Sequence, residues 1–234
     1  MTRLVPREPA AVAPGAVHLP EWLDLHGQRH LMSACTTWVA QAGGLRAPRM
    51  PRGGVMSVQI TCLGWHWYPY CYSRTVDDGD GRRVLPFPDW LGHLSRRAVA
   101  AARVLDEAVA GAEGEEHTRS AVDPAGFRPD VALINWYGPG ARMGMHADRE
   151  EASPAPVVSL SVGDTCVFRF GTTASRGRPW TDVELESGDL FVFGGPSRRA
   201  FHGVPRVVPD TAPAGLGLDG GRFNVTVRQT GLSG

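Results

Sequence analysis

Residues 222–228 (RFNVTVR) constrain the fold most, because polar and apolar side chains alternate there without a break. Alternation with a period of two is typical of a β-strand whose two faces differ in character. The polar face would carry Arg222, Asn224, Thr226 and Arg228, and the apolar face Phe223, Val225 and Val227. Two arginines on an inward face need anionic partners, since an unpaired buried charge is costly. The alternative is a half-exposed strand with solvated arginines.

The second half of the chain breaks into short apolar runs that are separated by Gly, Pro and Asp. We expect strands at 131–135, 157–162, 165–170, 183–185, 190–193 and 223–227, with a long Pro/Gly loop over 205–221 before the last one. Several short strands at this spacing favour a β-sandwich or jelly roll.

The first half predicts helices and a loop-rich cover. Apolar residues recur at helical spacing from about Glu21 to Ala42, and Pro88 opens a second helix that runs into an Ala-rich segment ending near Gly111. Residues 56–62 alternate as a strand does. We therefore predict a mainly β, α+β fold in which N-terminal helices pack on a β-core at about 130–234. We expect one domain over 16–234, with a covering region at about 46–85. Residues 1–15 would form a flexible segment.

Composition excludes several classes of protein. The 24 basic and 24 acidic residues give a formal net charge of zero, so no global field would attract nucleic acid or an anionic membrane, and nucleic-acid contact requires a local patch. The N-terminus lacks the apolar segment of a secretory signal, and no apolar run approaches the roughly 20 residues that span a membrane. The four cysteines form no C-x-x-C pair, which favours reduced, mostly buried thiols. The protein is expected to be cytoplasmic.

Two histidines and an aspartate form a candidate metal site. His146 and Asp148 are two residues apart, so on an extended chain both side chains point to the same face. This triplet alone is a weak signal, because an ordinary surface or capped histidine is a better explanation of His146 taken by itself. His202 follows a predicted strand and a Gly-Gly-Pro turn, and a jelly roll could return it to the same site. Two histidines and one carboxylate are the ligand set of non-haem iron(II) oxygenases, with coordination positions left open.

Polar side chains on predicted strands could hold a small anion beside this metal. Asn135 and Tyr137 share one face after an apolar run. Arg222 and Arg228 can bind carboxylates through paired hydrogen bonds. A metal site next to two arginines predicts an iron- and 2-oxoglutarate-dependent dioxygenase.

Six stretches of the sequence resemble the AlkB family of nucleic-acid dealkylases. They are 133–140 (LINWYGPG), 146–148 (HAD), 156–160 (PVVSL), 188–195 (GDLFVFGG), 202–203 (HG) and 222–228 (RFNVTVR). The last is the most specific. The match covers the C-terminal half firmly and extends weakly through residues 50–75.

This resemblance implies a double-stranded β-helix with Fe(II) at its mouth. It implies three metal ligands, which with Arg228 form the catalytic set: His146, Asp148 and His202. It implies five residues around the co-substrate 2-oxoglutarate: Asn135, Tyr137, Arg222, Asn224 and Arg228. Arg222 would pair with the distal carboxylate, and Arg228 would lie nearer the end that chelates iron.

Several residues are candidates for substrate binding. A target base must leave its stack to reach the iron, and aromatic rings would then hold it. By the resemblance, Trp65 would cover one face of that base and Tyr72 would lie near the base or its phosphate. The alternative for the segment 62–72 (CLGWHWYPYCY) is an aromatic cluster that packs under a loop. Arg149 and Glu150 follow the metal motif directly. Arg176 could contact phosphate, or be a solvated loop charge.

The resemblance implies an enzyme of DNA repair. It would oxidatively demethylate N1-methyladenine and N3-methylcytosine lesions in single- or double-stranded DNA, or in RNA, and would couple decarboxylation of 2-oxoglutarate by O2 to methyl hydroxylation and release of formaldehyde. We expect a monomer that does not bind membranes. Two alternatives stay open: an oxygenase of a small molecule or protein, and a non-catalytic sensor of the same fold.

Overall fold

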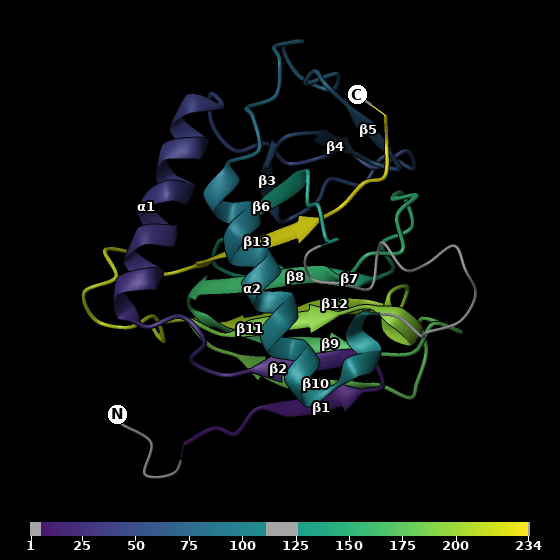
Figure 1. The fold of residues 1–234 in the computed structure, drawn as a ribbon. Helices are drawn as coiled ribbons and strands as arrows, with labels where there is room; N and C mark the ends of the chain where they lie inside the picture. The colour runs from purple at the N-terminus through teal and green to yellow at the C-terminus, as the bar shows by residue number, and fades with distance from the viewer. Residues whose placement is uncertain (1–5, 111–125, 234) are drawn as a thin grey trace.

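Two β-sheets face each other in this protein (Figure 1). The computed structural model describes residues 6–110 and 126–233. The larger sheet has the order β1 (Ala10–Ala13), β2 (Ala16–Leu19), β11 (Leu190–Phe193), β8 (Val157–Gly163), β13 (Arg222–Arg228), β6 (Val131–Tyr137), β3 (Gln59–Leu63). The smaller sheet has the order β10 (Thr181–Leu185), β9 (Thr165–Phe170), β12 (His202–Val208), β7 (Met143–His146). A separate hairpin consists of β4 (His66–Tyr68) and β5 (Cys71–Ser73).

Strand β13 pairs with antiparallel neighbours on both sides. Its Asn224 lies opposite Asn135 of β6 and Ser161 of β8. The alternation predicted for this strand is confirmed, because its three apolar residues pack on the side of the helices and its four polar residues line a cavity between the sheets. The pairing on both sides satisfies the main chain, so only the side chains distinguish the two faces.

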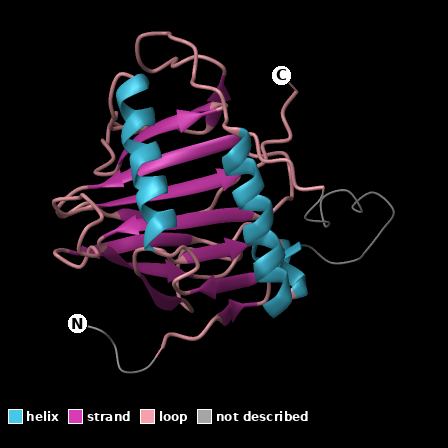
Figure 2. Cartoon of the chain, turned by 60° about the vertical axis from the view of Figure 1, so that its left-hand side comes forward, coloured by secondary structure: helices cyan, strands magenta, loops and turns pink. Residues whose placement is uncertain are grey.

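Both helices cover the same face of the larger sheet (Figure 2). Helix α1 (Leu25–Gln41) begins at Asp24, whose carboxylate accepts a hydrogen bond from the Gly27 amide, and α2 (Asp89–Leu105) follows Pro88. A short 3-10 turn, η1 (Glu107–Ala110), continues α2. Apolar side chains of both helices, among them Leu31 and Leu91, form one core with the outward face of the sheet.

A second core fills the space between the sheets. It is rich in aromatic rings, with Phe168 and Phe170 of β9 in contact with Phe191 and Phe193 of β11. A 3-10 turn, η2 (Gly195–Ser197), then leads from the larger sheet towards the smaller one. This core ends at the cavity, so the fold supports the site with rigid, buried rings.

The mainly β jelly-roll prediction and the positions of both helices are confirmed. The predicted flexible segment 1–15 is wrong for residues 10–13, which form β1, while residues 1–5 lie outside the description. The loop predicted over 205–221 is also wrong at its start, since β12 continues to Val208. The predicted helix end near Gly111 lies outside the described residues. The assignment of 16–234 to one domain stays a prediction.

Three of the four cysteines are buried and all four are free, as the sequence predicts. Across the described residues, no helix combines the length and the apolar character that crossing a membrane requires.

Candidate metal centre and co-substrate pocket

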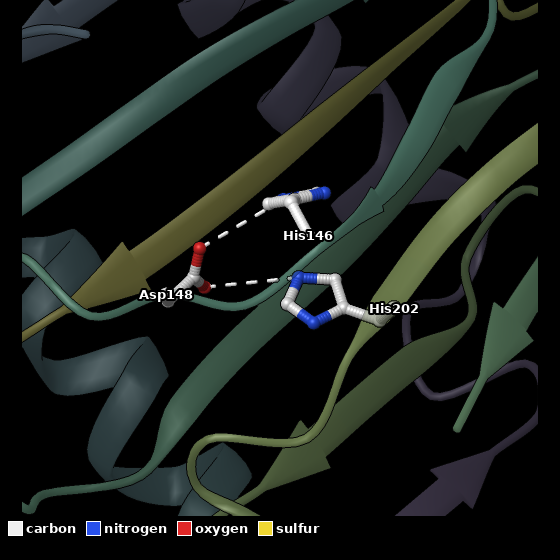
Figure 3. A group of neighbouring side chains, drawn as sticks. All are labelled: His146, Asp148 and His202. Atoms are coloured by element: carbon white, nitrogen blue, oxygen red, sulfur yellow. Dashed lines mark ion pairs between the residues drawn. The ribbon is translucent and has the colours of Figure 1, made fainter. Parts of the chain in front are cut away.

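Two paired strands bring the candidate metal ligands together. Strands β7 and β12 are antiparallel neighbours, and His202 lies directly opposite His146. Asp148 follows β7 by two residues, and its carboxylate faces both rings (Figure 3). Each histidine Nε2 lies 3.8 Å from an Asp148 carboxylate oxygen, and the three ligand atoms lie within 4.8 Å of one another. The convergence predicted from the sequence is confirmed.

Backbone carbonyls orient both imidazoles. The Nδ1 of His146 donates to the Gly144 carbonyl at 2.9 Å, and the Nδ1 of His202 donates to the Ala200 carbonyl at 3.0 Å. Each ring therefore carries its proton on Nδ1 and directs the Nε2 lone pair at Asp148. This is the arrangement that metal-ligating histidines adopt. The rings of Phe168 and Phe193 also pack against His202 and limit its rotation.

The charges at this site favour a cation. Burial, together with the neighbouring His146 ring, lowers the pKa of His202 to about 4, so this ring is neutral at pH 7. Burial alone would raise the pKa of Asp148, but Arg228 and the two histidines hold that pKa well below its usual value. A neutral His202 ring beside an ionised carboxylate is a combination of protonation states that suits Fe(II) binding.

A cavity of about 570 Å³ surrounds these ligands. Its floor is the inward face of the larger sheet, which contributes Asn135, Tyr137, Arg222, Asn224 and Arg228. Asn135 donates to Asn224 and Thr226, and Asn224 donates to Ser159 of β8. The structure therefore brings all five predicted co-substrate residues to one wall beside the candidate metal site.

Arg222 is fully buried and meets only neutral groups. Its guanidinium donates to the carbonyls of Asp164 and Leu185 at 3.1 and 3.2 Å and to the Ser161 hydroxyl at 2.9 Å. Within the described part of the chain it forms no ion pair, and its side chain is 1% exposed. A buried cation with neutral partners is unbalanced, and a carboxylate from a ligand would balance it.

Arg228 is equally buried but meets two carboxylates. Its Nη2 lies 2.8 Å from Oδ1 of Asp148, and its Nη1 lies 2.8 Å from Oε1 of Glu151. The Nη1 also donates to the Tyr72 hydroxyl at 3.2 Å. Although burial alone would lower the pKa of Arg228, the two carboxylates raise it well above its usual value. This arginine lies at the metal end of the floor, as the resemblance implies.

Buried side-chain atoms without hydrogen-bond partners indicate which groups the cavity can bind. In the chain from 6 to 110 and from 126 to 233, three buried side-chain atoms lack a hydrogen-bond partner: Asp148 Oδ2, Arg222 Nε and Arg228 Nε. Such atoms are rare in native proteins and call for an explanation. All three belong to residues that line the cavity. A metal ion at Asp148 and a diacid along the floor fit these residues.

The rim of the cavity carries the predicted charged residues. Arg149, Glu150 and Arg176 all line it. The guanidiniums of Arg149 and Arg176 lie 5.4 and 5.8 Å from the centre of the Phe201 ring. The structure thus brings these three predicted residues to the cavity.

Two substrate predictions need correction. Trp65 does not line the cavity: it is 6% exposed, its indole donates to Asp130 at 3.1 Å, and Arg74 covers its ring. The aromatic residues that do line the cavity from this region are Trp67 and Tyr70. Tyr72 is also absent from the lining, and its hydroxyl contacts Glu151 and Arg228 instead.

Sequence reasoning missed Glu151 and Arg198. Glu151 is 3% exposed and lies 3.1 Å from Arg198 as well as 2.8 Å from Arg228. Burial alone would raise its pKa, but the two arginines and the Tyr72 hydroxyl hold it below its usual value. The sequence signal was a second acidic residue, at the third position after the metal motif, which does not distinguish a buried carboxylate from the half-buried Glu150.

Comparison with known proteins agrees with this geometry. Residues 15–228 match the model of the 2OG-Fe(II) oxygenase superfamily. An AlkB homologue of Caulobacter vibrioides, named an alpha-ketoglutarate-dependent dioxygenase, is 36% identical over 95% of this chain and 90% of its own. Escherichia coli AlkB is 34% identical, over 82% of this chain and 81% of its own.

Plant proteins are also similar. The Arabidopsis thaliana DNA N(6)-methyladenine demethylase ALKBH1D is 31% identical over 93% of this chain. The chain spans about half the length of this relative and of ALKBH1C, at 50% and 49%. The solved structure of OsALKBH1 superposes with a TM-score of 0.78 at 32% identity and covers 94% of this chain and 100% of that one. The metal ligands, the arginine-bearing floor and these similarities together show that the chain belongs to the AlkB family of the 2OG-Fe(II) oxygenase superfamily.

Proposed function

We propose that this chain is an Fe(II)- and 2-oxoglutarate-dependent dioxygenase that removes N-alkyl groups from nucleobases. One observation carries the proposal: His146, Asp148 and His202 converge in the same cavity as a buried arginine that has no anionic partner among residues 6–110 and 126–233. A binding module would not need both an open metal site and an unbalanced buried cation. Both features match the needs of a metal-chelating diacid.

Each group in the cavity has a distinct task under this proposal. The Nε2 atoms of His146 and His202 and a carboxylate oxygen of Asp148 hold Fe(II). Arg222 binds the distal carboxylate of 2-oxoglutarate through charge-assisted hydrogen bonds, while Tyr137, Asn135 and Asn224 line its path towards the metal. Bound Fe(II) supplies activation of dioxygen, which drives decarboxylation of 2-oxoglutarate and hydroxylation of the substrate carbon.

The protein controls position and access. The floor of β6, β8 and β13 is rigid because each of these strands is paired on both sides, so Arg222 and Arg228 keep a fixed separation along β13. The aromatic core next to His202 excludes water from one side of the site. After hydroxylation of an N-methyl group, the hydroxyl proton leaves and the C–N bond breaks, so formaldehyde is released and the bonding electron pair returns to the ring nitrogen, which needs no further oxidant.

A nucleobase is the substrate that the rim supports. Trp67 and Tyr70 offer aromatic faces on which a base out of its stack can lie. Arg149 and Arg176 offer cations to the phosphates on either side. Related proteins are named DNA N(6)-methyladenine demethylase and, in Schizosaccharomyces pombe, tRNA demethylase. These names support a nucleic-acid substrate for this chain.

Finer features of the function remain part of the proposal. We propose N1-methyladenine and N3-methylcytosine as lesions, single- or double-stranded DNA as the main substrate and RNA as a second one. We further propose a monomer that works in the cytoplasm and plays a part in DNA repair. The neutral net charge supports local rather than global attraction of nucleic acid.

A formaldehyde-release assay tests the proposal. The protein is incubated with Fe(II), 2-oxoglutarate, O2 and oligonucleotides that carry one N1-methyladenine or N3-methylcytosine, and formaldehyde and succinate are measured. We expect equal amounts of both with methylated oligonucleotide and neither with Asp148→Ala. Succinate formed only with a small molecule or protein would move the function to another oxygenase class, and the absence of turnover with every substrate would overturn the proposal.

A further inference from the structure

A buried carboxylate outside the cavity holds the metal-binding aspartate in place. Glu151 does not line the cavity, yet three groups converge on it. The Nη1 of Arg228 lies 2.8 Å from Oε1, and the Nη2 of Arg198 lies 3.1 Å from Oε2. The hydroxyl of Tyr72 donates to Oε1. Both carboxylate oxygens are therefore engaged.

Both arginines that contact Glu151 also contact Asp148. The Nη2 of Arg228 binds the side-chain oxygen Oδ1 of Asp148 at 2.8 Å. The Nη1 of Arg198 donates to the main-chain carbonyl of Asp148 at 3.3 Å, and its Nε donates to the Ala155 carbonyl at 2.7 Å. The Glu151 carboxylate thus orients two guanidiniums, one bound to the side chain of Asp148 and the other to its main-chain carbonyl.

The charges in this group balance. Asp148, Glu151, Arg198 and Arg228 are two anions and two cations, and each is 7% exposed or less in its side chain. Without Glu151 the group would carry a net positive charge directly beside the position of a divalent cation. At short range in a buried site, that charge would oppose metal binding.

Arg228 also decides which oxygen of Asp148 is free. It occupies Oδ1, while Oδ2 has no hydrogen-bond partner and lies 3.8 Å from Nε2 of His202. An aspartate held in this way offers a single oxygen to a metal. Single-oxygen binding by the carboxylate leaves more of the coordination sphere open for a chelating co-substrate.

We propose that Glu151 is a positioning residue that acts through Arg228 and Arg198 to fix Asp148 as a single-oxygen metal ligand and to balance the charge beside the metal. The inference rests on the proposed metal-dependent function. Tyr72 extends the arrangement to the covering region, because it reaches Glu151 from strand β5. Tyr72 is then a support of the metal site and not a contact to the base.

Binding of Mn(II) alone tests this role without nucleic acid or turnover. The dissociation constant is measured by electron paramagnetic resonance for the wild type, Glu151→Gln and Tyr72→Phe. Outer groups that orient metal ligands typically change affinity by roughly 10–100-fold, and we expect that loss for Glu151→Gln. Tyr72→Phe keeps the charge and removes the two hydrogen bonds of the Tyr72 hydroxyl, to Glu151 and from Arg228, so we expect a smaller loss of about threefold.

The matched control is Asp182→Asn. Asp182 also accepts two hydrogen bonds from one arginine, Arg169, at 2.7 Å each, but it is exposed and does not line the cavity. The same isosteric loss of charge there should leave Mn(II) affinity unchanged. The visible spectrum of bound Co(II) should also change in Glu151→Gln and stay unchanged in the control, because only the former changes how Asp148 is held as a ligand.

The outcomes separate the inference from the proposed function. If the wild type binds no Mn(II), the metal-dependent function fails and the inference fails with it. If the wild type binds and Glu151→Gln binds equally well with the same Co(II) spectrum, only the inference is overturned. If Glu151→Gln does not fold, Tyr72→Phe decides: weakened metal binding supports the inference, and unchanged binding overturns it.

Discussion

The two ends of strand β13 bury the same residue type in opposite surroundings. Arg228 lies between the carboxylates of Asp148 and Glu151, so its charge is compensated within the chain. Arg222 lies at the other end of the same strand face, and its hydrogen bonds go to two carbonyls and one hydroxyl. The strand pattern makes the two positions equivalent, and only tertiary contacts make them different.

This difference implies separate roles for the two arginines. A compensated buried arginine stabilises the chain itself, because removing either partner would leave an unpaired charge in a low-dielectric interior. An uncompensated buried arginine contributes little to the stability of the fold, but its interaction with a ligand that supplies the anion is strongly favourable. Under the proposed function, Arg228 therefore supports the metal end of the floor, and Arg222 binds the distal carboxylate of the co-substrate.

Removal of Asp148 should have the largest effect. Asp148→Ala takes away a candidate metal ligand and one of the two carboxylates that compensate Arg228. We expect no detectable release of formaldehyde and no binding of Mn(II), because the two histidines alone make a poor site for this metal. Turnover by Asp148→Ala that matched the wild type would contradict a metal role for this residue.

Replacement of each arginine by methionine compares the two ends directly. Arg228→Met leaves the buried carboxylates of Asp148 and Glu151 without this cation. We expect the substitution to lower the free energy of unfolding by about 3–5 kcal/mol. Arg222→Met should stay within about 1 kcal/mol of the wild type, because relief of an unbalanced charge offsets the lost neutral hydrogen bonds. Urea unfolding of the metal-free proteins measures both changes in unfolding free energy. Equal losses of stability in the two variants would contradict the distinction between a compensated and an uncompensated arginine.

A second compensated cluster sharpens the comparison. Asp189 is fully buried, and Arg7 and His18 hydrogen-bond its carboxylate at 2.8 Å each. Burial alone would raise its pKa, but His18 and Arg7 hold the pKa below its ordinary value. Asp189→Asn should therefore cost about 3 kcal/mol at pH 7, near the lower end for a broken buried pair.

The pH dependence of that loss has a definite sign. A carboxyl group whose pKa is lowered by folding stabilises the protein above its ordinary pKa of about 4, and this stabilisation disappears as the pH falls through the lowered value. The gap in unfolding free energy between the wild type and Asp189→Asn should thus narrow below about pH 4 and stay constant from pH 5 to 7. A gap that widened in acid would contradict this account of Asp189.

The smallest effect is expected at the surface. The pair of Arg169 and Asp182 has good geometry but is largely solvated. Asp182→Asn should change the unfolding free energy by less than about 1 kcal/mol, as exposed ion pairs usually do. A loss as large as that of Arg228→Met would show that burial does not separate the two kinds of pair.

Strand periodicity made most of the site predictable. The side chains of Asn135, Tyr137 and the polar face of β13 had to share a direction, because alternate residues of a strand point the same way. The metal ligands could be predicted because they lie at or next to paired strands. The different partners of Arg222 and Arg228 could not, since Glu151 comes from a loop whose course no periodic pattern records.

The covering region shows the same limit. Trp65 and Trp67 are equivalent in the sequence, two residues apart in an aromatic run. The chain turns at Gly64, which has a φ of +78° and passes so close to Asp130 that a side chain would collide with its carbonyl. This approach lets the Trp65 indole bond to Asp130 and leaves Trp67 to line the cavity. Only the tertiary contact distinguishes the two rings.

The same comparison explains why charge alone was not informative in the sequence. Glu150 and Glu151 are adjacent, yet one lines the cavity and the other is buried between two arginines. Local propensity does not separate them, because both lie outside regular secondary structure.

Binding of 2-oxoglutarate to the Mn(II)-loaded protein without O2 tests the central claim most directly. Calorimetry compares the wild type with Arg222→Met, using 2-oxoglutarate and 2-oxobutyrate, which lacks the distal carboxylate. We predict that Arg222→Met weakens 2-oxoglutarate about 100-fold, since a charge-assisted pair is worth about 3 kcal/mol, and that both proteins bind 2-oxobutyrate equally weakly. Equal binding of 2-oxoglutarate by the two proteins would contradict the claim that Arg222 is reserved for that carboxylate.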